Sequence, residues 1–87
     1  MQVVYKYPIS ISDAVTLKLP RGARIVHLGM DANNVPCVWA LVDRYAGVST
    51  PREFCISGTG AVVSDNKEYI GTFFDMPFVW HVFADKL

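Results

Sequence analysis

About seven short apolar runs, each ended by a turn residue, constrain the fold of this chain more than any other feature. The runs are rich in Val, Ile, Phe, Trp and Thr, and each is followed by Gly, Pro, Asn or Asp. No window keeps the apolar spacing of an amphipathic helix. Short β-branched and aromatic runs bounded by turn residues are typical of strands. The sequence therefore predicts an all-β fold.

The predicted strands cover residues 3–8, 14–19, 24–30, 37–43, 53–57, 69–74 and 78–84. Strands spaced by about 8–12 residues indicate a small antiparallel sandwich or barrel of six to seven short strands. The run 37–43 is apolar on both faces, which is typical of a central strand, and it should pair with 24–30 as a hairpin. Strict alternation along 24–30 would place Ile25, His27 and Gly29 on one face. Ser12 and Asp13 predict one short helical turn in the irregular segment 9–15.

The length of the chain predicts one domain over residues 1–87. A domain this small buries only about 60–65% of its unfolded surface. Yet 52% of the residues are hydrophobic and 13% are aromatic. We therefore expect a homo-oligomer, with a dimer as the expected form, or a broad partner-binding face; the alternative is a dense monomeric core. The last run, 78–84, is apolar on both faces, so it should lie centrally or be covered by a partner.

The charge balance excludes some partners. Eight basic and eight acidic residues give a net charge of zero, and they form no run of like sign. Proteins that follow a nucleic-acid backbone carry a basic stripe, so extended nucleic acid is not an expected partner. No leader segment and no apolar stretch of roughly 18–20 residues is seen, so we expect a cytoplasmic protein without a membrane partner. Cys37 and Cys55 should be reduced and buried. A disulfide between them remains an alternative if the two strands that carry them pair.

The sequence offers little for catalysis or for a metal. His27 and His81 have no carboxylate at the spacing of metal ligands, so no metal site is predicted. No nucleophile motif is present either. We expect a protein that is not an enzyme and that uses no cofactor. Trp39 and Trp80 lie in the two most apolar runs and should pack in the core, with Trp39 as an anchor.

A small anionic ligand remains open, because it needs only two or three cations. Backbone amides in a Gly-rich turn can hold an anion, arginine binds phosphate through its fork, and an exposed tyrosine can stack on a base. Turn formation and solvated loop charges are the competing explanations. The candidate ligand-binding residues are Gly58, Thr59, Gly60, Arg21, Arg24, Arg52, Tyr5 and Tyr7.

Several motifs follow one another in an order that resembles a family of small proteins from tailed phages and prophages. They are Tyr5-Lys6-Tyr7-Pro8, Leu19-Pro20-Arg21-Gly22-Ala23, Trp39-Ala40-Leu41-Val42-Asp43, Gly58-Thr59-Gly60, Tyr69-Ile70-Gly71-Thr72-Phe73 and Phe78-Val79-Trp80-His81-Val82-Phe83. The match covers nearly the whole chain, and the chain departs from the pattern at 44–52 and 61–63. The resemblance implies a phage or prophage origin and a β-rich fold, but no established activity. With such an origin, the expected location is the host cytoplasm.

Two functional hypotheses follow from the resemblance and from the lack of catalytic motifs. The first is a binding protein that acts by occupancy and counters a host defence system, either by sequestering a nucleotide signal or by binding a defence protein. The second is a self-associating structural or assembly protein of the virion. Both rest on analogy between small phage proteins, because a fold does not by itself specify a function.

Overall fold

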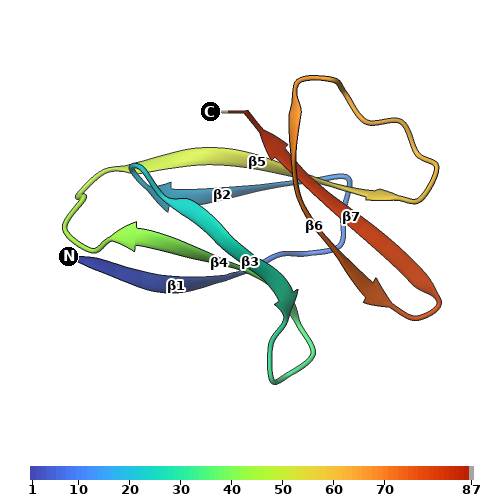
Figure 1. The fold of residues 1–87 in the computed structure, drawn as a ribbon, viewed down its shortest axis with the longest axis horizontal. Helices are drawn as coiled ribbons and strands as arrows, with labels where there is room; N and C mark the ends of the chain where they lie inside the picture. The colour runs from blue at the N-terminus through green and yellow to red at the C-terminus, as the bar shows by residue number, and fades with distance from the viewer. Residues whose placement is uncertain (87) are drawn as a thin grey trace.

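The computed structural model describes residues 1–86, and these form seven strands and no helix (Figure 1). A three-stranded sheet has the order β1-β4-β3, and a four-stranded sheet has the order β2-β5-β7-β6. Every strand pair is antiparallel. The strands are β1 (Gln2–Pro8), β2 (Ala14–Pro20), β3 (Arg24–Met30), β4 (Pro36–Asp43), β5 (Ser49–Gly58), β6 (Lys67–Asp75) and β7 (Phe78–Asp85). The prediction of an all-β antiparallel sandwich or barrel is confirmed, and the two sheets make it a sandwich.

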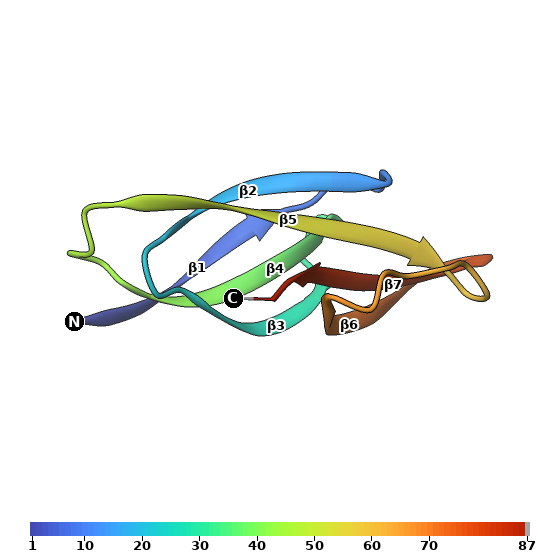
Figure 2. The same cartoon turned by 90° about the horizontal axis from the view of Figure 1, so that it is seen from above.

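The core lies between the two sheets, and the alternation of side chains along each strand supplies it. Seen edge-on, β2 and β5 form one layer, and β1, β4 and β3 form the other (Figure 2). The inward faces of β4, β5 and β7 contribute the residues Val38, Ala40, Val42, Phe54, Ile56, Val82 and Ala84, all of which are buried. The molecule is flat, with extents of 40 × 32 × 16 Å. Each sheet contributes a single layer of side chains to this core, as expected for two packed sheets.

Two of the three central strands, β4 and β7, lie where the sequence predicted them, and the third is β5. β4 lies between β1 and β3, and it pairs with β3 as a hairpin. β7 lies between β5 and β6. The apolar character of β7 on both faces is therefore explained by its central position, and it does not require a partner chain.

Two local predictions are wrong. The segment around Ser12 forms no helical turn; its hydroxyl instead donates to the Ala14 carbonyl at 3.0 Å. The strict alternation along β3 is broken by a bulge between Ile25 and His27. As a result Ile25 faces the core, while His27 faces outward opposite Trp39. An inserted residue shifts the register by one position, and such a shift cannot be read from the apolar pattern.

Trp39 is not a core anchor, because it lies on the outer face of the three-stranded sheet. Its neighbours Val38 and Ala40 fill the core, and alternation turns the indole outward, where it is half-buried. The His27 ring lies against it, with 5.3 Å between ring centres. Trp80, in contrast, packs against the core as predicted.

The two cysteines are both free and lie in different sheets. Cys37 is fully buried in β4, and burial raises the pKa of its thiol. Cys55 is half-buried in β5. A disulfide between them required β4 and β5 to be paired strands, and they are not. No helix in the described residues has the length and apolar character needed to cross a bilayer.

Candidate functional site

The outer face of the β6–β7 hairpin carries an unusual series of side chains. Paired positions share a face, and three successive pairs point away from the core. We call these residues the outer strip: Tyr69 and Phe83, Thr72 and His81, and Phe74 and Val79. A bulge between Tyr69 and Gly71 places Tyr69 and Thr72 on the same face although they are three positions apart.

A chain of hydrogen bonds runs through the middle of the outer strip. The Tyr69 hydroxyl lies 2.6 Å from Thr72 Oγ1, which lies 2.9 Å from His81 Nδ1. The other ring nitrogen, Nε2, lies 2.8 Å from Thr59 Oγ1. A neutral imidazole donates through one nitrogen and accepts through the other, so both hydroxyl contacts can be satisfied together. The chain fixes the orientation of the His81 ring and ties the turn at Thr59 to the hairpin.

The Gly58-Thr59-Gly60 segment is a tight turn, and one of its two glycines, Gly60, has a conformational reason. Gly60 has a φ of +91°, which favours glycine, and the Ala61 N–H donates to the Gly58 carbonyl at 3.1 Å. A Cβ atom at Gly58 would lie 3.8 Å from the Trp80 ring, which is an ordinary contact. The turn therefore explains Gly60 without a ligand, whereas nothing in the structure requires a glycine at position 58.

The end of the hairpin is apolar and exposed. We call Phe74, Met76 and Phe78 the apolar tip; their exposed fractions are 66%, 84% and 55%. The hairpin end projects beyond the ends of β3 and β4 (Figure 1). Phe78 lies on the inner side of the hairpin and stacks on Trp80 with 5.5 Å between ring centres, whereas Phe74 lies on the outer side. The tip therefore presents apolar side chains on both sides of the hairpin end. Exposed apolar side chains gathered at one place indicate a contact surface.

The opposite end of the hairpin is charged. Lys67 forms an ion pair with Asp85 and lies 3.7 Å from a Glu53 oxygen. The hydrogen bond between Lys67 and Asp85 raises the pKa of the lysine and lowers the pKa of the carboxyl group. One amine is thus shared by two carboxylates, which leaves an excess of negative charge within this ion-pair cluster. Arg52 pairs with Glu68 beside it, and Lys86 follows Asp85. Asp75, next to the tip, adds a second negative charge.

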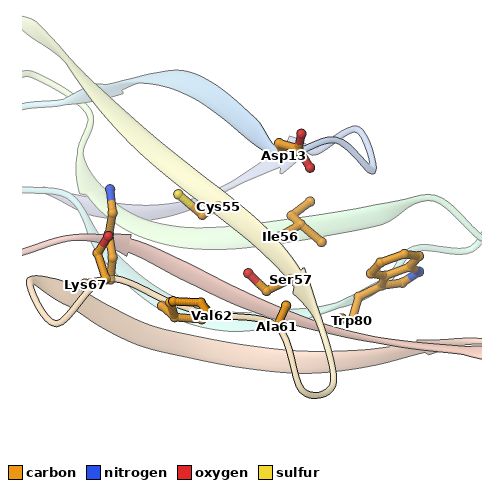
Figure 3. Close-up of a pocket in the computed structure, with 11 residues that line it drawn as sticks. Asp13, Cys55, Ile56, Ser57, Ala61, Val62, Lys67 and Trp80 are labelled. Atoms are coloured by element: carbon orange, nitrogen blue, oxygen red, sulfur yellow. The ribbon is translucent and has the colours of Figure 1, made fainter.

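A cleft of about 370 Å³ lies between β5 and the loop that follows the turn (Figure 3). Figure 3 shows Ala61 and Val62 of this loop, with Trp80 at one end of the cleft and Lys67 at the other. Lys67 is the one basic side chain among the described residues that line the cleft, and its charge is already paired. The cleft is therefore poorly suited to an anion.

The predicted ligand-binding residues do not meet in one cleft. Arg52 lies six residues before Gly58 on β5, which corresponds to roughly 20 Å along an extended strand. Arg21 lies in the β2–β3 turn, while Arg24 begins β3 and lines a second cleft, of about 360 Å³, together with Arg52. The Gly58-Thr59-Gly60 turn instead contacts His81.

The two candidate tyrosines lie apart from these clefts. Tyr5 and Tyr7 pair with Ala40 and Val38 and so share the inner face of the three-stranded sheet. Tyr7 packs against the core, and its burial raises the pKa of the phenol. Tyr5, at the sheet edge, remains exposed. In addition, no group of three or more His, Cys, Asp or Glu side chains within residues 1–86 is arranged to hold a metal ion.

The outer strip and the apolar tip were not identified from the sequence. One signal was present, because Phe74-Asp75-Met76-Pro77-Phe78 places large apolar residues where a hairpin turn is usually polar. The chain of hydrogen bonds had no such signal, since Thr59, Thr72 and His81 are distant in sequence and meet only through strand pairing.

Comparison with known proteins identifies one family. No curated protein and no solved structure matches the chain. The model of a domain of unknown function, DUF7352, matches residues 1–87. The match spans both sheets, the outer strip and the apolar tip, and the chain therefore belongs to the DUF7352 family.

Proposed function

We propose that this protein is a binding module that acts by occupying a protein partner, and that the outer strip and the apolar tip form its contact surface. The observation that supports this proposal most directly is the exposure of Phe74, Met76 and Phe78 at the end of a hairpin whose base is packed in the core. Aromatic residues and Met are enriched in protein interfaces and supply much of their binding energy. The hydrogen bonds of His81 hold the middle of this surface in place, which reduces the entropy lost on binding.

A protein partner is better supported than a nucleotide. A nucleotide site needs cations that converge in a concave pocket. Arg52 is buried and already bonded, and the candidate arginines lie away from the Gly58-Thr59-Gly60 turn. The outer strip is the face of a sheet, a shape that suits another protein surface.

The resemblance to small phage proteins supports a more specific proposal. A phage-encoded, non-enzymatic binding domain of this kind would act in the host cytoplasm on a defence protein. This step rests on analogy between small phage proteins and on the lack of catalytic motifs in the sequence.

The proposal is tested by capture of a partner from bacterial lysate on three immobilised proteins. These are the wild type, the tip variant Phe74→Ser/Met76→Ser, and the control Val62→Ser, which removes an apolar side chain that is 97% exposed but outside the surface. A partner held by the wild type and the control should bind the tip variant at least about tenfold more weakly in titrations with the purified partner. Equal binding by all three proteins would exclude the tip as the contact.

The nucleotide alternative has its own test. Wild type and Arg24→Ala are titrated calorimetrically with cyclic and linear nucleotides. If the wild type binds a nucleotide and Arg24→Ala binds it more weakly, sequestration of a nucleotide is favoured. If no nucleotide in the panel binds, and a protein partner binds through the apolar tip, the proposed function is supported.

A second candidate function is a self-associating structural protein of the virion. It is favoured by the outer face of the three-stranded sheet, where apolar side chains remain exposed although β4 and its neighbours already form a complete core.

A further inference from the structure

The outer face of the three-stranded sheet has the composition of a contact surface. Outward side chains of a sandwich are normally polar. Here Trp39 and Leu41 of β4 are half-buried, and Val4 and Val26 on the flanking strands are exposed. The register places Val4 beside Leu41 and sets Trp39 between Lys6 and His27. We call this surface the Trp39 face; it comprises Val4, Lys6, Arg24, Val26, His27, Trp39 and Leu41.

The Trp39 face carries an excess of positive charge. Lys6 pairs with Asp31 at 3.0 Å, and the N-terminal amine pairs with Asp43 at 3.5 Å. Arg24 lies next to Leu41 and forms no ion pair with any described residue. A partner for this face should therefore combine apolar side chains with an excess of negative charge.

The β6–β7 hairpin of the same protein has those properties. Its tip is apolar, and its charged end holds one lysine between Glu53 and Asp85. Asp75 beside the tip has no ion pair within residues 1–86. Pairing two hairpins, or two Trp39 faces, would bring like charges together. Pairing the hairpin of one copy with the Trp39 face of another brings opposite charges together and covers both apolar surfaces.

We propose that the protein associates with itself head to tail, with the outer strip and the adjoining Met76 of one copy on the Trp39 face of the next. This inference deepens the proposed function, because it names a second copy as a partner of the same hairpin surface. A one-way contact between two different surfaces is heterologous and produces closed rings or open filaments, whereas two reciprocal contacts of this kind would make a two-fold dimer.

The size of the Trp39 face sets the expected strength. Three strands of seven to eight residues cover roughly 15 by 25 Å at normal strand spacing. A standard interface buries about 800 Å² on each partner, so this contact is at the small end. We therefore expect association in the micromolar range that depends steeply on concentration and on salt.

Sedimentation velocity with complementary variants tests the proposal. The strip variant is Phe74→Ser/Met76→Ser, and the face variant is Arg24→Glu/Val26→Ser; all four side chains are exposed, so both variants should fold. The mass of the wild type should rise with concentration, and Val62→Ser should behave in the same way. Each variant alone should associate at least about tenfold more weakly. Their equimolar mixture should form a dimer and nothing larger. The strip variant keeps an intact Trp39 face and the face variant keeps an intact outer strip, so one contact forms between them and the two remaining surfaces are both mutated.

Three results would overturn the proposal. The wild type could remain a monomer up to near-millimolar concentration, one variant could associate as well as the wild type, or the mixture could fail to form the dimer. Circular dichroism and melting curves of both variants establish that they are folded. A monomeric wild type that still captures a host protein through the tip would overturn this inference while leaving the proposed function intact.

Discussion

At the scale of single residues, Arg52 shows how burial changes the role of a charged side chain. It is only 7% exposed, and its guanidinium donates to the Asp85 carbonyl at 3.2 and 3.0 Å and to a Glu68 oxygen at 2.8 Å. The charge also lies 5.6 Å from the centre of the Phe54 ring. Buried charges persist where they are paired and hydrogen-bonded. Arg52 therefore joins β5 to the end of β7 and is not available to a ligand.

The position of Trp39 leads to a prediction about stability. A fully buried Trp or Phe changed to Ala costs about 3–5 kcal/mol, and Phe54, with no exposed surface, should show a loss of that size. Trp39→Ala should cost less than Phe54→Ala, because the Trp39 ring lies on the outer face of the sheet beside His27 and is only partly buried. Urea unfolding of both variants measures the difference. Equal losses for the two variants would mean that Trp39 is part of the core.

At the scale of secondary structure, the contact between β3 and β6 closes one side of the sandwich. The two strands belong to different sheets, and both contain a bulge, at Val26 and at Ile70. In the edge-on view β6 and β7 lie beside β3 (Figure 2). Gly71 lies at the point of closest approach, where a Cβ atom would be 2.9 Å from Leu28 Cδ2. A residue without a side chain is needed there for β6 to reach β3.

We predict that Gly71→Ala destabilises the fold by about 1–3 kcal/mol, because Leu28 is packed against the core and cannot move away. Gly29→Ala is the matched control. Its Cβ atom would meet His27 Nε2 at 2.8 Å, but His27 is exposed and its ring can rotate. Midpoints of urea unfolding should therefore shift much more for Gly71→Ala. Similar shifts for both variants would contradict the close packing of β6 on β3.

At the scale of the whole molecule, the sandwich protects its strand edges and leaves its faces open. The edge strands β1 and β2 each carry a lysine and end in a proline, and both features oppose pairing with another strand. The other two edges, β3 and β6, are bulged and lie against each other. Association should therefore use the Trp39 face and the hairpin, because no edge strand offers a regular row of backbone hydrogen-bonding groups to a strand of another copy.

The response of the whole molecule to acid follows from its carboxyl groups. Hydrogen bonds from the Val35 N–H and from Lys6 lower the pKa of Asp31 to about 2, and similar contacts lower the pKa of Asp43 and of Asp85. A carboxyl group with a lowered pKa in the folded state stabilises the protein above its ordinary pKa, near 4, and loses that contribution as the pH falls. We therefore predict that the melting temperature falls between about pH 4 and pH 2.

The variant Asp31→Asn isolates one of these groups. It keeps an oxygen for the Asn33 and Val35 N–H groups but loses the charge that faces Lys6. Its melting temperature should lie below that of the wild type at neutral pH, and the two values should converge as the pH approaches about 2. A difference that stays constant over this range would show that the Asp31 charge does not stabilise the fold.

The sequence by itself determined the strands, the pairing of β3 with β4 and the central position of β4. Seven strands, the β3–β4 hairpin and the central place of β4 were all predictable, because strand formation depends on local apolar runs and turn residues. The sequence also determined the turn at Gly60, whose positive φ favours glycine.

Only the tertiary structure decided which side chains meet. Whether Trp39 faces the core depends on which sides of β4 are covered, and the bulge at Val26 changes the facing of every residue after it. Likewise, Thr59, Thr72 and His81 meet because β5, β7 and β6 are neighbours in one sheet. Sheet order is set by the burial of apolar surface across the whole chain, and no local pattern records it. For that reason the predicted arginines and the Gly58-Thr59-Gly60 turn were separated, while an unpredicted histidine came to bind that turn.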